Sequence, residues 1–556
     1  MARQSYSLTV ESYSVLLIAQ TVSSCLTHSH RILSPKREGL PMELRSTEEE
    51  KQPQPPHFLI VTYPAQGHIT PARHLARRLV LAGARVTVCI PVSAFRKMFP
   101  AAAEGDGSGS GEDEEREEEG DGVAYASYSD GYDGGFDRAA DDHAKYLARV
   151  RQEGARTLSA LLGRLRDGGP RRRGPVTCAV YTLLMPWVSR VAAEHGVAHV
   201  AVFWIQPATA LAAYYHYFRG SRERFLMAAA AREPSGGAEE VRLPGLPPLR
   251  LRDLPSFLAI TSDDDRFAAV IPEFAALIDA IERDGDPARP APTYVLANTF
   301  DAMELDALAS LRPHVEVVTI GPVLSFLHDE ADGNNNSPPN DLFGHDGEGG
   351  YLSWLDAQRA KSVVYISFGS TSVMSKAQVA EIADAMEQSH RPFLWVLRKD
   401  NCRDGEDDEK EAIKELLAAA TAAGSVVVEW CDQARVLAHP AVGCFVTHCG
   451  WNSTLESVAC GVPTVAAPQY SDQGTCAWLV ERELGAGVRA TARAEDGVLE
   501  AGELRRCVEF AMSEAVSAHA TAWKKEARAA VADGGVSDRN LREFVSRIAM
   551  ARCNTE

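Results

Sequence analysis

The sequence predicts an α/β protein made of two successive Rossmann-like domains. Its 556 residues exceed what one ordinary hydrophobic core holds, which favours two domains. Apolar residues make up 45% of the chain and charged residues 24%, as is typical of globular proteins. Apolar runs of strand length alternate with segments of helical spacing in two series, separated by a polar, turn-rich stretch at 334–341. This rhythm indicates parallel sheets that are buried on both faces.

The first series begins at residue 57. "HFLIVTYP" (57–64) predicts a buried strand, and 70–84 predicts a helix with a Pro at its start and a Gly near its end. "RVTVCI" (85–90) completes a strand–helix–strand unit. Further strands are expected at 176–181, 199–204 and 293–300, a helix from Pro186, and an extended Pro- and Leu-rich loop at 243–257.

The second series predicts strands at 362–370, 393–397, 425–430 and 443–448. We expect five segments: a disordered extension (1–56), an acceptor-binding N-terminal domain (57–333), a linker (334–347), a C-terminal domain (348–545) whose last helix packs back on the first, and a tail (546–556). Open sheets of this kind bind ligands beyond the carboxyl ends of their strands. A cleft between the domains is therefore the expected site.

Charge and cysteine usage exclude several classes of protein. Of the net charge of −19, the segment 104–121 contributes −9, with ten acidic residues and one Arg, and it predicts a solvated loop, as does 401–412. No basic stripe for nucleic acid and no apolar run of membrane-spanning length exist. Eleven cysteines lack paired spacing, and five lie in apolar or helical stretches: Cys89, Cys178, Cys444, Cys460 and Cys476. We therefore expect reduced thiols and a cytoplasmic protein. We also expect the protein to be a monomer.

A metal site is not expected. His448 and Cys449 lie close to Cys444 in the sequence, but no second pair of ligating residues follows at the spacing that zinc sites use.

The segment 448–473 concentrates polar residues around two short apolar runs. His448 ends a strand, Gly450 permits a tight turn, and Asn452 or Ser453 is placed to cap the following helix. The free N–H groups and the dipole of such a helix start form an anion site, and Glu456 lies one turn deeper, where a carboxylate accepts bonds from ribose hydroxyls. A capped helix with a buried histidine explains the same residues, so both interpretations stay open at this point.

Two further features favour a nucleotide-sugar ligand. Trp430 ends the preceding strand, where its ring is suited to stack on a flat base, and Gln433 offers an amide to the base or the ribose. Asp472 and Gln473 follow a strand at a turn into a helix, a geometry suited to sugar hydroxyls.

Residues 430–473, "WCDQARVLAHPAVGCFVTHCGWNSTLESVACGVPTVAAPQYSDQ", resemble the complete sugar-donor signature of plant UDP-dependent glycosyltransferases of secondary metabolism. The segments "HFLIVTYPAQGHITPARHLARRL" and "VYTLLMPWV" are most similar to the branch with anthocyanin 5-O- and indole-3-acetate glucosyltransferases. The resemblance implies a GT-B fold, in which two Rossmann-like domains face each other across a cleft. It implies inverting transfer of glucose from UDP-glucose, a co-substrate with no further cofactor, to a hydroxyl or carboxyl group of a small lipophilic metabolite such as a flavonoid, phenolic or hormone-like acid.

The resemblance also implies roles for individual residues. Trp430 would stack on uracil, Glu456 would bind the ribose, and the closing Gln473 resembles members that use UDP-glucose. The full donor-binding set is Ser370, Trp430, Cys431, Gln433, His448, Gly450, Trp451, Asn452, Ser453, Glu456, Asp472 and Gln473. For the acceptor we expect Gln66, Trp187, Phe203 and Gln206, while a place in the hydrophobic core suits Trp187 and Phe203 equally well.

His68, in the turn after the first strand, matches the family's general base. Most members pair this histidine with an Asp, but Thr182 stands at the matching position. Three accounts are open: another acid substitutes, with Asp130 and Asp133 as candidates; His68 works alone; or the acceptor is acidic enough to need little help.

Two other functions are found on Rossmann-like folds of this kind. A nicotinamide-dependent oxidoreductase requires G-x-G-x-x-G after the first strand, where this chain has "PAQGHITP". A non-catalytic UDP-sugar sensor is compatible with Thr182 as the mark of a decayed site, whereas the intact His68 argues against it.

Overall fold

The computed structural model describes residues 55–99, 115–117, 122–137, 141–167, 174–230, 240–282, 293–327, 350–370, 372–398, 418 and 424–553. The expected extension up to residue 54, the linker 334–347 and the acidic loop 401–412 lie outside these residues. So does most of the acidic segment 104–121, but its residues Glu115–Glu117 form strand β3, which pairs antiparallel with β4 (Val123–Tyr128) and is itself an edge strand of the first sheet. This stretch is therefore not all loop, because backbone pairing at a sheet edge does not require apolar side chains.

The first sheet has eight strands in the order β10-β9-β6-β5-β1-β2-β4-β3, all parallel except β3. Its parallel strands are β1 (His57–Val61), β2 (Arg85–Pro91), β4 (Val123–Tyr128), β5 (Cys178–Tyr181), β6 (His199–Trp204), β9 (Tyr294–Ala297) and β10 (Glu316–Thr319). The central strand β1 is buried along its whole length. The strands expected from apolar runs after residue 57 are all present, and β4 and β10 extend the sheet beyond them.

The second sheet has six parallel strands in the order β13-β12-β11-β14-β15-β16. They are β11 (Val363–Ser367), β12 (Phe393–Val396), β13 (Val426–Val428), β14 (Val442–Thr447), β15 (Thr464–Ala466) and β16 (Gly487–Arg489). The four predicted strands are confirmed, and two three-residue strands complete the sheet.

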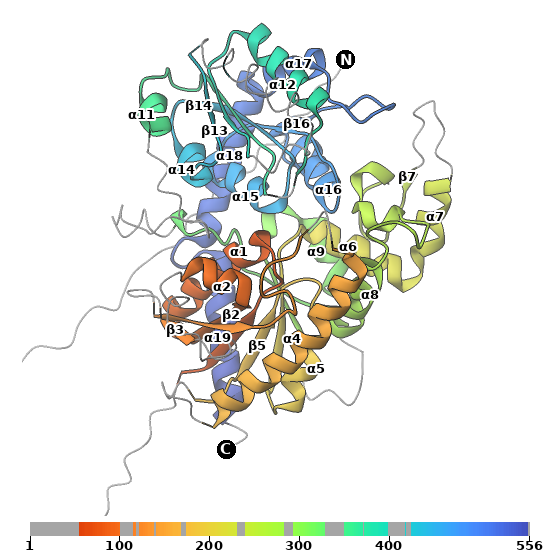
Figure 1. The fold of residues 1–556 in the computed structure, drawn as a ribbon, viewed down its shortest axis with the longest axis vertical. Coiled ribbons are helices and arrows are strands. Elements are labelled where there is room, and N and C mark those ends of the chain that lie inside the picture. Colours follow the sequence, from red (N-terminus) through yellow and green to blue (C-terminus); the bar gives the residue numbers. More distant parts are fainter. Residues whose placement is uncertain are drawn as a thin grey trace, which may run out of the picture. The chain divides into compact units, whose positions relative to one another are not determined.

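Helices cover both sheets (Figure 1). In the first half they are α1 (Gln66–Leu81), α2 (Val92–Met98), α4 (His143–Arg166), α5 (Trp187–Glu194), α6 (Ala208–His216), α7 (Arg222–Ala230), α8 (Val270–Ile281) and α9 (Leu305–Leu311). In the second they are α11 (Gly350–Asp356), α12 (Lys376–Ser389), α14 (Gln433–Ala438), α15 (Trp451–Cys460), α16 (Gln473–Trp478), α17 (Ala501–Ala511) and α18 (Glu514–Val531). The last helix, α19 (Val536–Cys553), continues through most of the expected tail.

Each sheet reverses its strand order once, and these reversals determine where a ligand binds. In the first sheet, chain order runs outward from β1 to β2 on one side and to β5 on the other. In the second, the same reversal separates β11 from β14. The loops that follow neighbouring strands at such a point diverge and leave a crevice. His68 and Thr182 follow β1 and β5, while Ser370 and His448 follow β11 and β14.

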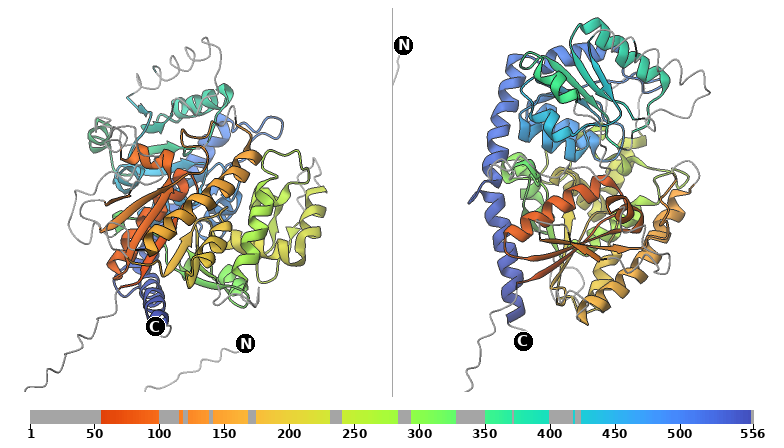
Figure 2. Two further views of the ribbon diagram at one scale, coloured as in Figure 1. Left: turned by 60° about the horizontal axis from the view of Figure 1, so that its bottom comes forward. Right: turned by 60° about the vertical axis from the view of Figure 1, so that its left-hand side comes forward.

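The last two helices contact different halves of the molecule. Helix α18 packs on α15, whereas α19 packs on β10, and the blue C-terminal helices are seen along their length in the right-hand view of Figure 2. In α19, the ring of Phe544 lies 5.9 Å from that of Phe58 and 5.2 Å from that of Tyr294. Asn540 Nδ2 donates to the carbonyl oxygen of Thr319. The C-terminal helix thus packs against the core of the first half.

The Pro- and Leu-rich segment 243–257 is not only an extended loop. It contains strand β8 (Leu249–Arg250), which pairs with β7 (Glu240–Val241), and a 3₁₀ helix at Leu251–Asp253, with a second 3₁₀ helix beginning at Ser256. At its end, Ser256 exchanges two hydrogen bonds with Ser471 of the second half, at 2.8 and 2.7 Å. These two hydrogen bonds therefore join the first half to the second at the end of this segment.

Candidate active site

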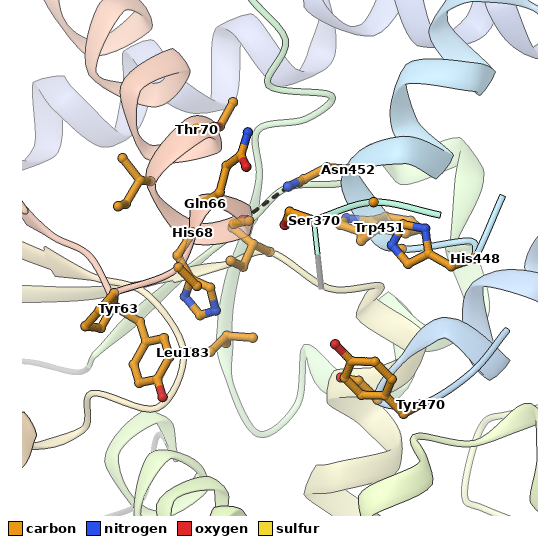
Figure 3. A pocket seen from close by; sticks show the side chains of 18 of the residues that line it. Tyr63, Gln66, His68, Thr70, Leu183, Ser370, His448, Trp451, Asn452 and Tyr470 are labelled. Carbon is orange, nitrogen blue, oxygen red and sulfur yellow. Dashed lines mark hydrogen bonds between the residues drawn. The ribbon is translucent and has the colours of Figure 1, made fainter. Parts of the chain in front are cut away.

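A cavity of about 2060 Å³ opens between the carboxyl ends of the two sheets. Its lining includes His68, Gln66 and Gln206 from the first half together with every member of the predicted donor-binding set from the second: Ser370, Trp430, Cys431, Gln433, His448, Gly450, Trp451, Asn452, Ser453, Glu456, Asp472 and Gln473. Figure 3 shows His68 on one side of this cavity and His448, Trp451 and Asn452 on the other. Positions separated by more than 300 residues in the chain thus share one space.

His68 lies in the first turn of α1, and its partner is Thr182. The Nδ1 atom of His68 is 2.9 Å from Oγ1 of Thr182, which also accepts a hydrogen bond from the N–H of Tyr63. Burial lowers the pKa of His68 to about 3, so the imidazole is neutral at physiological pH. A neutral imidazole facing a cavity can accept a proton.

No carboxylate among the described residues is paired with His68. Asp130 lines the cavity, but its Oδ1 accepts from the N–H of Tyr132, and Asp133 accepts from the hydroxyl of Ser129. Burial is the cause of the lowered pKa of His68, without a contribution from either acid. The account in which another acid replaces the usual Asp therefore gains no support from these two candidates.

Helix α1 begins earlier than its sequence predicts. We expected its first turn at Pro71, but it starts at Gln66, directly after the turn that follows β1, and Pro71 is inside it. The helix tolerates this proline because the fixed φ of the ring is helical and only one backbone hydrogen bond is lost. As a result, His68 is held by helical backbone rather than by a loop.

The start of α15 also differs in detail from the prediction. Its N-cap is Gly450, with no side-chain cap, so Asn452 and Ser453 lie within the first turn instead of capping it. The φ of Gly450 is −65°, which any residue adopts; the left-handed residue is Cys449, with φ 62°. Gly450 is needed for space, because a Cβ there would lie 2.6 Å from Nε2 of His448.

A second glycine, Gly369, also lies close to the His448 ring. A Cβ on Gly369 would lie 2.6 Å from Cε1 of His448, and Gly369 has φ 74°, a conformation that favours glycine. The imidazole of His448 therefore lies close to two backbone segments, the turn that contains Gly369 and the start of α15. Burial lowers its pKa to about 4, so it is neutral and offers a hydrogen bond without a charge.

The residues expected to hold the nucleoside form one hydrogen-bonded group. Gln433 Nε2 donates to Oε2 of Glu456 at 2.6 Å and to Oγ of Ser453 at 3.0 Å. Its Oε1 accepts from the hydroxyl of Tyr365 at 3.1 Å, a residue that sequence analysis did not single out. Burial raises the pKa of Glu456 to about 7. These hydrogen bonds fix the orientation of the Glu456 carboxylate and the Gln433 amide, both of which line the cavity.

Asp472 and Gln473 are buried at the start of α16. Oε1 of Gln473 accepts from the N–H groups of Gln469 and Tyr470, at 2.8 and 3.2 Å, which fixes the turn before the helix. Burial raises the pKa of Asp472 to about 6. This turn presents one carboxylate and one amide side by side, a pair suited to vicinal hydroxyls.

The acceptor prediction is corrected at two of its four residues. Trp187 packs against Tyr128 and closely over Gly154, and Phe203 is fully buried on β6, so both belong to the hydrophobic core and neither lines the cavity. Phe203 lies near the end of β6 and Trp187 at the start of α5, but both side chains are packed in the core instead of facing the cavity. Gln66 and Gln206 do line the cavity.

An aromatic wall, defined here as Tyr63, Phe136, His143, Tyr146, Phe267 and Tyr470, was missed by the sequence prediction. Neighbouring rings lie 4.2 to 6.5 Å apart, and Phe267 of the first half stacks on Tyr470 of the second at 5.7 Å with an interplanar angle of 8°. All six line the cavity. Their segments are distant in sequence, so no local pattern brings them together.

The other sequence expectations concern cysteines and membrane spans. The five cysteines expected to be reduced are buried, and none of them forms a disulfide with another described residue. Among the described helices, none combines the length and apolar character needed to cross a membrane.

Comparison with known proteins identifies relatives. Residues 345–503 match the family model described as "UDP-glucoronosyl and UDP-glucosyl transferase". The tomato (Solanum lycopersicum) UDP-glycosyltransferase 75C1 is 39% identical over 502 residues, which cover 89% of this chain and 99% of the relative. The Perilla frutescens anthocyanidin 3-O-glucoside 5-O-glucosyltransferase 1 is 39% identical over 501 residues, with the same coverage.

A solved structure shares the fold. The O. sativa protein Os79, crystallised in complex with UDP, superposes with a TM-score of 0.69 at 30% identity, covering 88% of this chain and all of Os79. This similarity confirms the GT-B architecture that the sequence resemblance implies.

Proposed function

The chain belongs to the plant UDP-glycosyltransferase family and is an enzyme of that class, and from this premise we propose that it transfers glucose from UDP-glucose, with inversion, to a small plant metabolite. The observation that carries the proposal is that His68 and the whole expected donor-binding set line one cavity. The reacting group of the acceptor is a hydroxyl or a carboxyl group.

The donor is proposed to lie along the second half. Uracil stacks on Trp430, the ribose hydroxyls bond to Glu456, and the diphosphate meets the first turn of α15 beside His448 and Ser370. The free N–H groups of that turn carry the positive end of the helix dipole, which stabilises the charge that develops on UDP as it departs. Asp472 and Gln473, together with Trp451, then hold the glucose.

The displacement needs one proton acceptor. We propose that the acceptor oxygen attacks the anomeric carbon while Nε2 of His68 takes its proton and the bond from that carbon to UDP breaks on the opposite face. An α-linked donor then gives a β-linked product. Neutral His68 is in the form that can accept the proton, and Thr182 orients it.

The acceptor is proposed to be flat and largely apolar. The aromatic wall offers ring faces for stacking, which suits a flavonoid-like compound. The Perilla relative is named for an anthocyanidin glucoside, which supports the same class. We further propose that the protein acts in secondary metabolism as a cytoplasmic monomer. Light scattering of the purified protein would check the oligomeric state, and imaging of a fluorescent fusion would check the location.

The sensor alternative has no support among the relatives reported above, which are named as transferases. Mass spectrometry of products from UDP-glucose and a panel of phenols, alcohols and carboxylic acids tests the proposal. A hexose adduct on any of them establishes the reaction. If tightly bound UDP but no adduct were found, the sensor would replace the transferase.

The same assay with His68→Ala tests the third account of Thr182. A rate that is retained on carboxylic acids but lost on alcohols shows that acidic acceptors need no base. An equal loss on all acceptors refutes that account.

A further inference from the structure

Asn452 crosses the cavity to the backbone of the first half. Its Nδ2 donates to the carbonyl oxygen of Gly67 at 3.1 Å, and this bond joins residues that are 385 positions apart in the sequence. Figure 3 shows the dashed bond running from Asn452 to the first turn of α1, next to His68. The bond therefore links the turn expected to hold the diphosphate with the turn that carries the general base.

Gly67 can accept this bond because of a proline four residues further on. In a regular helix the N–H of residue 71 would donate to the oxygen of residue 67. Pro71 has no N–H, and its ring also pushes that carbonyl away from the helix axis. An exposed helix carbonyl that lacks its intrahelical donor is open to a donor from the other half.

The neighbouring residue makes a second bond between the halves. Trp451 Nε1 donates to the carbonyl oxygen of Asn298, which follows β9, at 2.8 Å. Two consecutive residues of α15 thus hold its first turn against the first half. Since Asn452 has two amide protons on Nδ2, the bond to Gly67 leaves one for a ligand in the cavity.

We propose that Pro71 is a positioning residue: by keeping the Gly67 carbonyl free for Asn452, it sets the distance between the diphosphate-holding turn of α15 and His68. This inference rests on the proposed function. It concerns geometry during the chemical step, so it predicts an effect on kcat more than on UDP affinity. The residues proposed to hold the nucleoside, Trp430 and Glu456, are not part of this link.

Pro71→Ala is the test. Without the proline ring, the Gly67 carbonyl turns back toward the helix axis to accept from the new N–H, and so away from Asn452. Loss of one hydrogen bond of ordinary strength lowers kcat by about 2- to 12-fold. The melting temperature does not fall, since alanine is the better helix former. The dissociation constant for UDP, measured by calorimetry, changes less than twofold.

A matched control is Pro272→Ala in α8. Pro272 is exposed and is the third residue of its helix, where the N–H has no intrahelical partner. This variant makes the same chemical change without altering a hydrogen bond, so its kcat stays at the wild-type value.

A double-mutant cycle with Asn452→Ala decides between positioning and a merely structural role. If Pro71 acts through Asn452, Pro71→Ala has no further effect on kcat in the Asn452→Ala background. Equal losses in both backgrounds, or no loss in the single variant, would overturn the proposal. A wild-type enzyme that forms no hexose adduct with any acceptor would instead refute the proposed function.

Discussion

Thr182 Oγ1 lies 2.9 Å from Nδ1 of His68, and the other partners of that hydroxyl determine which nitrogen carries the proton. Oγ1 accepts from the N–H of Tyr63 and is placed to donate to Sδ of Met185 at 4.0 Å. A hydroxyl has one proton and two lone pairs. When that proton is directed at sulfur, Nδ1 donates to Oγ1, and Nε2 keeps the lone pair that a general base needs.

This arrangement orients His68 but supplies no negative charge. Thr182→Asp places a carboxylate beside Nδ1, which stabilises the imidazolium and raises the pKa of His68 from its low value. We expect kcat on weakly acidic alcohols to rise by roughly tenfold, a fraction of the roughly 10²–10⁴-fold that general-base catalysis contributes in full. Rates with carboxylic acids should change little, since these acceptors arrive ionised.

Steady-state kinetics of Thr182→Asp with an alcohol and a carboxylic acid provides the measurement. Thr182→Ser is the control, since it keeps the hydroxyl. A variant whose rate rises equally on both acceptors, or on neither, would show that charge beside His68 does not limit this enzyme.

The raised pKa of Glu456 predicts that donor binding depends on pH. Burial raises its pKa to about 7, so the group is ionised above that pH and becomes neutral below it. A neutral carboxyl group accepts hydrogen bonds from ribose hydroxyls more weakly than a carboxylate does. The value of kcat/KM for UDP-glucose should therefore fall as the pH drops from 8 to 6.

The pH profile of kcat/KM in Glu456→Gln checks this assignment. The variant should bind donor more weakly at pH 8 and lack the step near pH 7. His68 does not account for such a step, because its pKa lies near 3. Persistence of the step in the variant would assign it to another group, with Asp472, whose pKa is about 6, as the next candidate.

The strands and the donor side could be predicted because both are encoded locally. Apolar β-branched runs bounded by turn residues gave the central strands, and strand ends placed His68, Ser370 and His448. The three-residue strands β15 and β16 are too short to show a period. Strand β4, which follows the acidic segment and lies next to the edge strand β3, is rich in small residues.

The contacts across the cavity could not be predicted, because they depend on where two separately folded sheets meet. The bond from Trp451 to Asn298 spans 153 positions, and the bond from Asn452 to Gly67 spans 385. The misplacement of Trp187 has a related cause. Trp187 is the first residue of α5, where a side chain can point into the cavity or into the core, and sequence alone did not show which.

Gly450→Ala should weaken donor binding without unfolding the protein. The added Cβ would lie 2.6 Å from Nε2 of His448, so the ring must leave its place between Gly450 and Gly369. Displacement of a ligand-orienting group by about 1 Å can cost a hundredfold. We expect the KM for UDP-glucose to rise by roughly tenfold or more.

Gly502→Ala is the matched control for that substitution. Gly502 is a helical residue of α17 with open space around its Cα, so a methyl group there meets nothing within 4 Å. Its kinetics should equal those of the wild type. A Gly450→Ala enzyme with an unchanged KM would show that His448 has room that the structure does not reveal.

Arg489 and Asp253 form a buried ion pair between the halves, and breaking it should destabilise the protein. Nη1 of Arg489 donates to Oδ1 of Asp253 at 2.6 Å, and the two side chains are 7% and 9% exposed. Arg489 also donates to the carbonyl oxygens of Arg252 and Gly474, so it holds the segment before Ser256 against the start of α16. Removing one member of such a pair leaves an uncompensated buried charge.

Asp253→Ala should therefore lower the free energy of unfolding by about 3–5 kcal/mol, as measured by urea denaturation. Asp253→Leu combined with Arg489→Met removes both charges and should cost less than the single variant, because no charge is left buried without a partner. If the double variant were the less stable of the two, the pair would contribute net stability rather than only mutual compensation. A single variant that unfolds at the wild-type urea concentration would show that water reaches Arg489 and replaces the carboxylate.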